Sequence, residues 1–152
     1  MEPRMNHPAF VVSGAVDALH RLGEVAAATG VPSATLKMVE LRASQINGCS
    51  LCVDMHTREL RKAGASDERI ATVAAWRDAP WFSDAEGAAL ALTEAVTRIA
   101  DRPDAVTDAI WAEATKHYDE SQLSGLLLDI GTINVWNRLN AATRRVAGEY
   151  IP

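Results

Sequence analysis

The chain has 152 residues, of which 48% are hydrophobic and 23% are charged, and its formal net charge is −5. This balance is typical of one globular domain spanning residues 1–152, and the negative charge argues against nucleic-acid binding, which requires a basic surface. The sequence lacks both a run of about 18 apolar residues and the apolar segment of a signal peptide, so we expect a cytoplasmic protein without a membrane span.

Seven helices are predicted from apolar residues at helical spacing and from the turn residues between them. The first runs from Pro8 to about Ala28, the second from Ala34 to about Gln45 with Ser33 as N-cap, and the third from the cysteine pair to Gly64. The fourth runs from Ser66 to about Trp76, and the fifth from the capping box Ser83–Glu86 to about Ala100. The sixth spans about Asp104 to His117, and the seventh starts near Glu120 and passes residue 140. No strand-type alternation persists anywhere, so the predicted fold class is all-α.

The last helix is apolar on two sides. One stripe contains Leu123, Leu126, Leu127, Ile130 and Ile133, and the other contains Leu128, Val135, Leu139 and Val146. A helix that is apolar on two sides is covered on two sides. In so short a chain a second subunit is a reasonable cover, and we therefore expect a homo-oligomer.

Both cysteines of the protein, Cys49 and Cys52, lie in one C-x-x-C pair, and His56 follows four residues later. On a helix with about 100° per residue, the two sulfurs lie about 60° apart and the imidazole lies angularly between them. The charged residues Asp54 and Arg58 fall on the opposite side. The pattern predicts that the thiols and the imidazole face inward at the first turns of a helix.

This arrangement favours redox chemistry. A helix N-terminus and a neighbouring imidazolium both favour thiolate over thiol, and residues i and i+3 are close enough for a disulfide to form. Two buried structural cysteines are the simplest alternative. A zinc site is a further alternative, but Cys49, Cys52 and His56 supply three ligands where a structural zinc site has four, so we expect no metal.

The segment S-Q-I-N-G-C-S-L-C-V-D-M-H-T, residues 44–57, resembles the AhpD-like alkylhydroperoxidases of the carboxymuconolactone decarboxylase superfamily. The segment N-V-W-N-R-L, residues 134–139, is similar to the same family, and the likeness extends roughly from residue 36 to residue 139. The resemblance implies an AhpD-like helical bundle that assembles as trimers or hexamers. It also implies a peroxidase that reduces hydroperoxides through the C-x-x-C pair.

By this resemblance Cys52 corresponds to the peroxidatic thiol, Cys49 to the resolving thiol and His56 to a member of a proton relay. No bound cofactor is implied, and the reductant is an external dithiol, in one branch of the family a dihydrolipoyl group. The chain departs from the family at Lys37, where peroxidases of this type carry a glutamate. Glu40, on the same helix, is the nearest carboxylate that could replace it. A second histidine that some relatives carry between the cysteines is Leu51 here.

Two other functions are compatible with these residues. Decarboxylase-type lactone chemistry, as in the name of the superfamily, would not need the cysteines. A redox-responsive oligomer would use the disulfide to change its packing without peroxide turnover. His7, His20 and His117 have no reactive neighbours in the sequence and are expected to be surface or packing residues.

Overall fold

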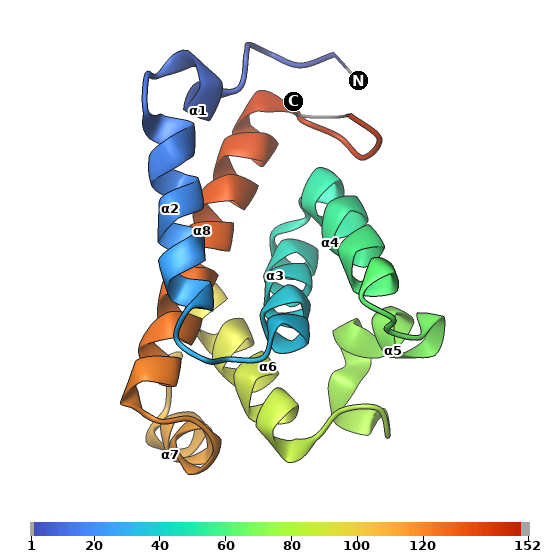
Figure 1. Ribbon diagram of the computed structural model, residues 1–152, viewed down its shortest axis with the longest axis vertical. Helices are drawn as coiled ribbons and strands as arrows, with labels where there is room; N and C mark the ends of the chain where they lie inside the picture. Colours follow the sequence, from blue (N-terminus) through green and yellow to red (C-terminus); the bar gives the residue numbers. More distant parts are fainter. Residues whose placement is uncertain (1, 150–152) are drawn as a thin grey trace.

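The computed structural model describes residues 2–149, which form eight α-helices and one 3₁₀ helix and contain no strand (Figure 1). The elements are α1 (Pro8–Val11), α2 (Ala15–Ala27), α3 (Ser33–Asn47), α4 (Ser50–Lys62), α5 (Asp67–Thr72), η1 (Val73–Asp78), α6 (Asp84–Thr97), α7 (Asp108–His117) and α8 (Glu120–Thr143). The all-α prediction is confirmed. None of the helices in this part of the chain is long and apolar enough to span a membrane.

Helix α3 lies at the centre of the bundle and packs against α4, α6 and α8, while α2 runs along α8 (Figure 1). Its apolar residues enter two cores, because a central helix is covered on several sides. Leu36 and Val39 pack with residues of α6, α7 and α8, and Met38 and Leu41 pack with residues of α4, α5 and α6. A third, smaller cluster joins both cysteines to Ile133 on α8.

Local sequence signals start and stop the helices next to the cysteine pair. Gly48 ends α3 with φ 67°, and Gly64 follows α4 with φ 88°, a left-handed conformation that glycine adopts without a steric penalty. The capping box predicted at Ser83 and Glu86 is confirmed, with both reciprocal hydrogen bonds present at the start of α6. The turn at Gly48 fixes the direction in which α4 leaves α3.

The prediction of one continuous helix from Pro8 to about Ala28 is wrong. The chain is extended at Val12 and left-handed at Gly14, with φ 78°, and this break separates α1 from α2 and raises the number of α-helices from seven to eight. Val11 and Val12, next to this break, are 57% and 61% exposed.

Three later boundaries also differ from the prediction. The sixth predicted helix begins at Asp108 rather than Asp104, because Asp104 has φ 55° and Thr107 caps the helix instead. The predicted fourth helix divides into α5 and η1, with non-helical backbone at Ala75. The fifth ends at Thr97, three residues early. These ends depend on single backbone angles that hydrophobic periodicity does not encode.

The second apolar stripe of α8 faces outward. Leu128 and Val135 are 42% and 41% exposed, whereas Leu126 and Ile130, on the first stripe, are fully buried. The exposed stripe is the surface on which the expectation of a homo-oligomer rests, and that expectation stays a prediction.

Helix α8 packs tightly against the C-terminal end of α2 at Gly125. A Cβ atom at this position would lie 2.0 Å from Oγ1 of Thr29 and 2.9 Å from the carbonyl oxygen of Ala26. The Thr29 hydroxyl is itself held by a 2.8 Å hydrogen bond to that carbonyl. The absence of a side chain at Gly125 therefore allows α2 to pack along α8 and to form one wall of the site described below.

We expect Gly125→Ala to destabilise the protein by about 1–3 kcal/mol, because an added methyl group overpacks this contact by more than the gain in helix propensity of about 1 kcal/mol. Gly131→Ala on the same helix is the matched control, since nothing lies within 4 Å of its Cβ position. It should leave stability unchanged or raise it. Urea unfolding of both variants measures the difference, and equal effects would contradict the packing argument.

Candidate active site

The cysteine pair lies where α3 turns into α4. Cys49 is the N-cap of α4, with extended backbone, and Cys52 is in its first turn. The Sγ atoms are 2.8 Å apart in the free thiol form, and the residues are only 2% and 1% exposed. The prediction that both sulfurs face inward is confirmed, although Cys49 precedes the helix rather than belonging to it.

A cavity of about 750 Å³ reaches Cys52 from the side of α2. Its apolar walls include Leu19, Met55, Ile133 and Trp136, and its polar groups include His56. Cys49 is not among the lining residues. Only Cys52 is therefore open to a molecule in this cavity, while Cys49 lies behind it.

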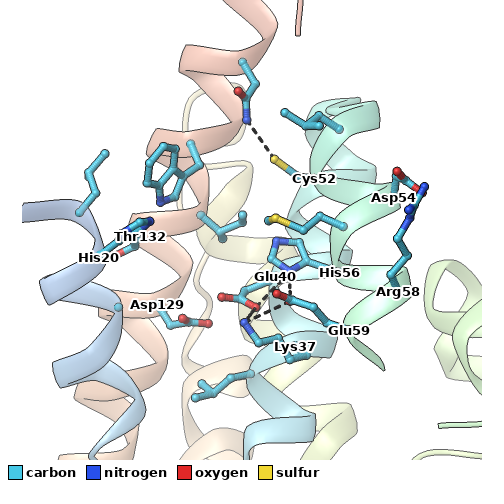
Figure 2. A pocket seen from close by; sticks show the side chains of 18 of the residues that line it. His20, Lys37, Glu40, Cys52, Asp54, His56, Arg58, Glu59, Asp129 and Thr132 are labelled. Atoms are coloured by element: carbon cyan, nitrogen blue, oxygen red, sulfur yellow. Dashed lines mark hydrogen bonds and ion pairs between the residues drawn. The ribbon is translucent and has the colours of Figure 1, made fainter. Parts of the chain in front are cut away.

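The contact between the two sulfurs and a hydrogen bond from the Asn140 amide shift the pKa values of Cys49 and Cys52. The hydrogen bond from the Cys52 thiol lowers the pKa of Cys49 to about 6, although burial opposes this shift. The same hydrogen bond, together with burial, raises the pKa of Cys52. Nδ2 of Asn140 lies 3.2 Å from Sγ of Cys52 and donates to it, which favours negative charge on that sulfur (Figure 2). The pair thus loses one proton readily and the second with difficulty, and the remaining proton lies between two sulfurs in hydrogen-bond contact.

His56 connects the cavity to a group of carboxylates. Its Nδ1 lies 3.0 Å from Oε2 of Glu59 and 3.3 Å from Oε2 of Glu40. Figure 2 shows the ring between Cys52 on one side and these carboxylates on the other. Nε2 is buried and has no hydrogen-bond partner. With Nδ1 held by carboxylates, Nε2 is the ring atom available to exchange a proton with a bound molecule.

Lys37, the departure from the family pattern, is part of the same cluster. Its Nζ lies 2.8 Å from Glu40 and 3.3 Å from Glu59. Burial lowers the pKa of Lys37, but the two carboxylates raise it by more, so it remains a cation. The hydrogen bond from His56, aided by Lys37, holds the pKa of Glu59 at about 2 despite partial burial. Glu40, one helical turn beyond Lys37, thus reaches the histidine, and Lys37 compensates its charge.

The cluster also has the composition of a metal site. One ligand atom from each of Glu40, His56 and Glu59 lies within 4.8 Å of the others. However, the Lys37 ammonium contacts the same two carboxylate oxygens that would face a metal ion. A metal would have to displace it, so these residues fit a metal poorly, and they do not include the cysteines of the zinc alternative.

Asp129 on α8 is a further acidic group in the cavity wall, and no pattern in the sequence distinguishes it from an ordinary polar residue. It is 4% exposed, and its Oδ2 has no hydrogen-bond partner. Figure 2 shows its carboxyl group turned toward Lys37 and Glu40. Burial, and then the charge of Glu40, raise the pKa of Asp129 to about 8, against the opposing effect of Lys37. The cavity therefore contains a carboxylic acid that is neutral at pH 7.

Asp129 should make stability fall as the pH rises. Its folded pKa of about 8 exceeds the ordinary value of 3.8, so the folded state binds the proton more tightly, and stability is lost between about pH 4 and pH 8. We expect Asp129→Asn to remove this loss and to be more stable than wild type at pH 8, by on the order of 1–3 kcal/mol. Thermal unfolding at a series of pH values tests this, with the exposed Asp17→Asn as control. Parallel curves for wild type and Asp129→Asn would contradict it.

Side-chain amides attach the turn before Cys49 to α8. Asn47 donates hydrogen bonds to Asn134 at 3.0 Å and to Asn137 at 2.9 Å, and Asn137 donates to Ser44 at 3.0 Å. Asn137 is only 1% exposed. This network holds the end of α3, and with it the position of the cysteine pair, against α8.

The structure brings together the four residues predicted from the sequence, Cys49, Cys52, His56 and Glu40, around one end of the cavity. It adds Glu59, Asp129 and Asn140. Glu59 follows His56 by three residues, so helical spacing could have identified it. His7, expected at the surface or in packing, is 2% exposed. His20 lines the cavity edge, and His117 pairs with Glu113 at 3.3 Å, far from the cysteines in sequence.

Comparison with known proteins identifies relatives over most of the chain. The profile of the carboxymuconolactone decarboxylase family matches residues 14–95. The chain is 41% identical to the uncharacterized protein YdfG of Bacillus subtilis over 71% of its own length and 72% of that protein. It is 33% identical to the uncharacterized protein YnjA of Escherichia coli over 69% of its own length, but spans only 56% of that protein.

Three further similarities concern the peroxidase branch and the fold. The alkyl hydroperoxide reductase AhpD of Bradyrhizobium diazoefficiens is 44% identical over 43 residues, which cover 28% of this chain and 24% of that protein. A crystal structure from Agrobacterium tumefaciens, of a protein of unknown function with a suggested role as the antioxidant defence protein AhpD, superposes with a TM-score of 0.88. The two chains are 31% identical over 98% of this chain and 100% of that one. The debrominase Bmp8, 20% identical, shares the fold over 88% of this chain and 71% of its own, with a TM-score of 0.76.

Proposed function

The chain belongs to the carboxymuconolactone decarboxylase family, and from this premise we propose that it is a thiol-dependent hydroperoxide reductase that cycles Cys49 and Cys52 between dithiol and disulfide. One observation carries the proposal. Two buried sulfurs lie 2.8 Å apart as free thiols, and one of them opens into a cavity that also contains an imidazole.

The first step is attack by the Cys52 thiolate on the distal oxygen of a hydroperoxide. The O–O bond breaks, Cys52 is oxidised to a sulfenic acid, and the proximal oxygen leaves as an alkoxide that takes up a proton. Although the hydrogen bond between the sulfurs favours charge on Cys49, Cys52 is the sulfur that the cavity reaches. Transfer of the shared proton from Cys52 to Cys49, across 2.8 Å, places the charge on the accessible atom.

The second step uses Cys49, the sulfur that does not line the cavity. Cys49 attacks the sulfenic acid of Cys52, a disulfide forms, and water leaves after hydroxide takes up the Cys49 proton. A dithiol reductant then opens the disulfide by exchange and is itself oxidised. Because both cysteines are nearly fully buried, this reductant must be slender enough to enter the cavity, as a dihydrolipoyl-type arm is.

His56 is the group best placed to protonate the leaving alkoxide. Its Nε2 has no partner, and its Nδ1 is held by Glu40 and Glu59, which would stabilise the positive ring before it gives up the proton. In this proposal Glu40 takes the part of the family glutamate that Lys37 replaces. Lys37 balances the charge of the second carboxylate, Glu59.

The experiment that tests the function compares native and alkylated protein. We expect the protein with dihydrolipoamide as reductant to consume cumene hydroperoxide catalytically, and the protein alkylated with N-ethylmaleimide to be inactive. The decarboxylase alternative predicts that activity on a carboxylated lactone survives alkylation. The redox-responsive oligomer predicts a change of assembly state on oxidation without catalytic peroxide loss. Either of these results, without peroxide turnover, would overturn the proposal.

A further inference from the structure

The N-terminal segment, residues 2–7, packs against the C-terminal end of α8, at the same end of the bundle as the cysteine pair. The backbone N–H of Arg4 donates to the carbonyl of Thr143 at 3.0 Å, and Arg145 donates to the carbonyl of Met5 at 3.2 Å. Figure 1 shows this segment lying beside the C-terminal end of α8. His7 follows directly and is buried there, 2% exposed, although the reaction proposed above does not use it.

The surroundings of His7 fix which nitrogen carries its proton. Nδ1 accepts the backbone N–H of Ala9 at 3.2 Å and so caps α1. Burial, and then the charge of Arg145, lower the pKa of His7, so the ring is neutral and its proton is on Nε2. Ring contacts with Phe10 and Trp136, each at 5.5 Å between centroids, hold the imidazole in place.

Asn140, on α8, contacts the cavity sulfur. Its Nδ2 donates to Sγ of Cys52 at 3.2 Å, while its Oδ1 is buried and has no hydrogen-bond partner. Nε2 of His7 is also buried and has no hydrogen-bond partner. The imidazole contacts Trp136, which lies one helical turn before Asn140 on α8, so His7 lies on the side of α8 that carries Asn140, and the Asn140 side chain opposes the lowering of the pKa of His7. A buried donor and a buried acceptor, each without a hydrogen-bond partner, thus lie on the same side of α8.

We propose that His7 is a positioning residue for Cys52: its Nε2–H holds Oδ1 of Asn140 and thereby directs the Asn140 NH₂ group at the sulfur. An amide can rotate by half a turn, and in the reversed orientation its oxygen would face the sulfur and repel a thiolate. A buried N–H can donate only to the amide oxygen, so it selects one orientation. The inference rests on the proposed function, because a directed donor matters only if Cys52 must carry charge.

The other charged groups near His7 do not provide the same selection. The positive charge of Arg145 lowers the pKa of His7, and its guanidinium lies 3.6 Å from the carboxylate of Glu149, so this charge is partly compensated within the C-terminal segment. Arginine has only donors and cannot complement the Nε2–H. Asn140 is therefore the acceptor to which the geometry points.

Two substitutions separate the orienting role from the capping role. In His7→Asn the short side chain still caps α1 but offers no group at the position of Nε2. In His7→Gln the longer amide places an N–H near that position but gives up the short cap. We would measure the pH dependence of iodoacetamide alkylation of Cys52 in a Cys49→Ser background, with thermal unfolding as the check on folding.

The expected result is that His7→Asn raises the apparent pKa of Cys52 by about one unit, which slows alkylation at neutral pH about tenfold. His7→Gln should alkylate within about twofold of the parent even where the lost cap lowers its thermal stability. In an Asn140→Ala background, His7→Asn should have no further effect, because its path to the sulfur is gone. The inference is overturned if His7→Asn alkylates like the parent, or if both substitutions slow alkylation equally.

The failure of this inference is distinguishable from failure of the proposed function. Alkylation reports the charge on Cys52 without any hydroperoxide. If His7→Asn and His7→Gln differ as expected while the wild-type protein leaves cumene hydroperoxide intact, the positioning role stands and the reductase proposal fails. If the wild-type protein turns over the hydroperoxide and the two variants alkylate alike, the positioning role is wrong.

Discussion

Cys52→Ser is expected to reduce hydroperoxide turnover about a thousandfold or more, to the rate without protein. A hydroxyl group is a far weaker nucleophile than a thiolate, and removal of a nucleophile eliminates the covalent route altogether. Cys52 is also the only one of the two sulfurs that lines the cavity, so no second thiol replaces it. The rate of cumene hydroperoxide loss in the presence of a dithiol measures the effect.

Cys49→Ser is the matched control for this substitution. It removes the resolving thiol but leaves the attacking one, so the protein should consume one equivalent of hydroperoxide and then stop. The product should be a sulfenic acid on Cys52 that dimedone traps. If the serine variants exchange these behaviours, the roles of the two cysteines are reversed, and if both turn over hydroperoxide like wild type, the reductase proposal is wrong.

His56→Asn is expected to lower kcat/KM for a bulky hydroperoxide about 10²-fold, the usual contribution of a general acid. The asparagine amide takes the place of Nδ1 beside Glu40 and Glu59, so the carboxylates keep a donor. Nothing then extends toward the cavity from the position of Nε2, and the leaving alkoxide loses its proton source. Pre-steady-state peroxide loss measures the first chemical step alone.

Glu59→Gln is the companion variant for His56. Glu59 is partly exposed, and Glu40 still contacts Nδ1 at 3.3 Å when Glu59 is neutralised. We therefore expect only a few-fold loss of rate. A change of less than threefold in His56→Asn, or a larger loss in Glu59→Gln than in His56→Asn, would contradict the assignment of the acid to Nε2.

The sequence was sufficient where local patterns determine the structure. The capping box at Ser83, the helix end at Gly64 and the inward face that contains Cys52 and His56 all follow from spacing within one helix and its ends. These features depend on residues that are neighbours in the chain. The family resemblance added the expected fold, which the structural comparison shows over nearly the whole chain.

Other features depend on contacts between residues that are distant in the sequence. Asp129 looks like an ordinary polar residue of a helix, and only the packing of α3 and α8 buries it beside Glu40. His7 is separated from Asn140 by most of the chain, so no spacing rule connects them. The break at Gly14 depends on one positive φ angle, whereas the apolar residues on either side of it predict a continuous helix.

The consequence of Lys37 differs between the sequence pattern and the folded protein. In the sequence it replaces the carboxylate that the family resemblance leads us to expect. In the structure its ammonium lies between Glu40 and Glu59, and Glu40 reaches the imidazole from one turn further along α3. The histidine thus keeps a carboxylate partner from α3, with a lysine that balances the added charge.

The most direct measurement is the stoichiometry of one oxidation. The reduced protein, which has two thiols, is mixed with one equivalent of cumene hydroperoxide in the absence of reductant, and free thiols, remaining hydroperoxide and protein mass are determined. We expect both thiols to disappear for each hydroperoxide consumed and the protein to lose two hydrogen atoms, with Cys49 and Cys52 linked by a disulfide. Persistence of both thiols with the hydroperoxide undiminished would contradict it.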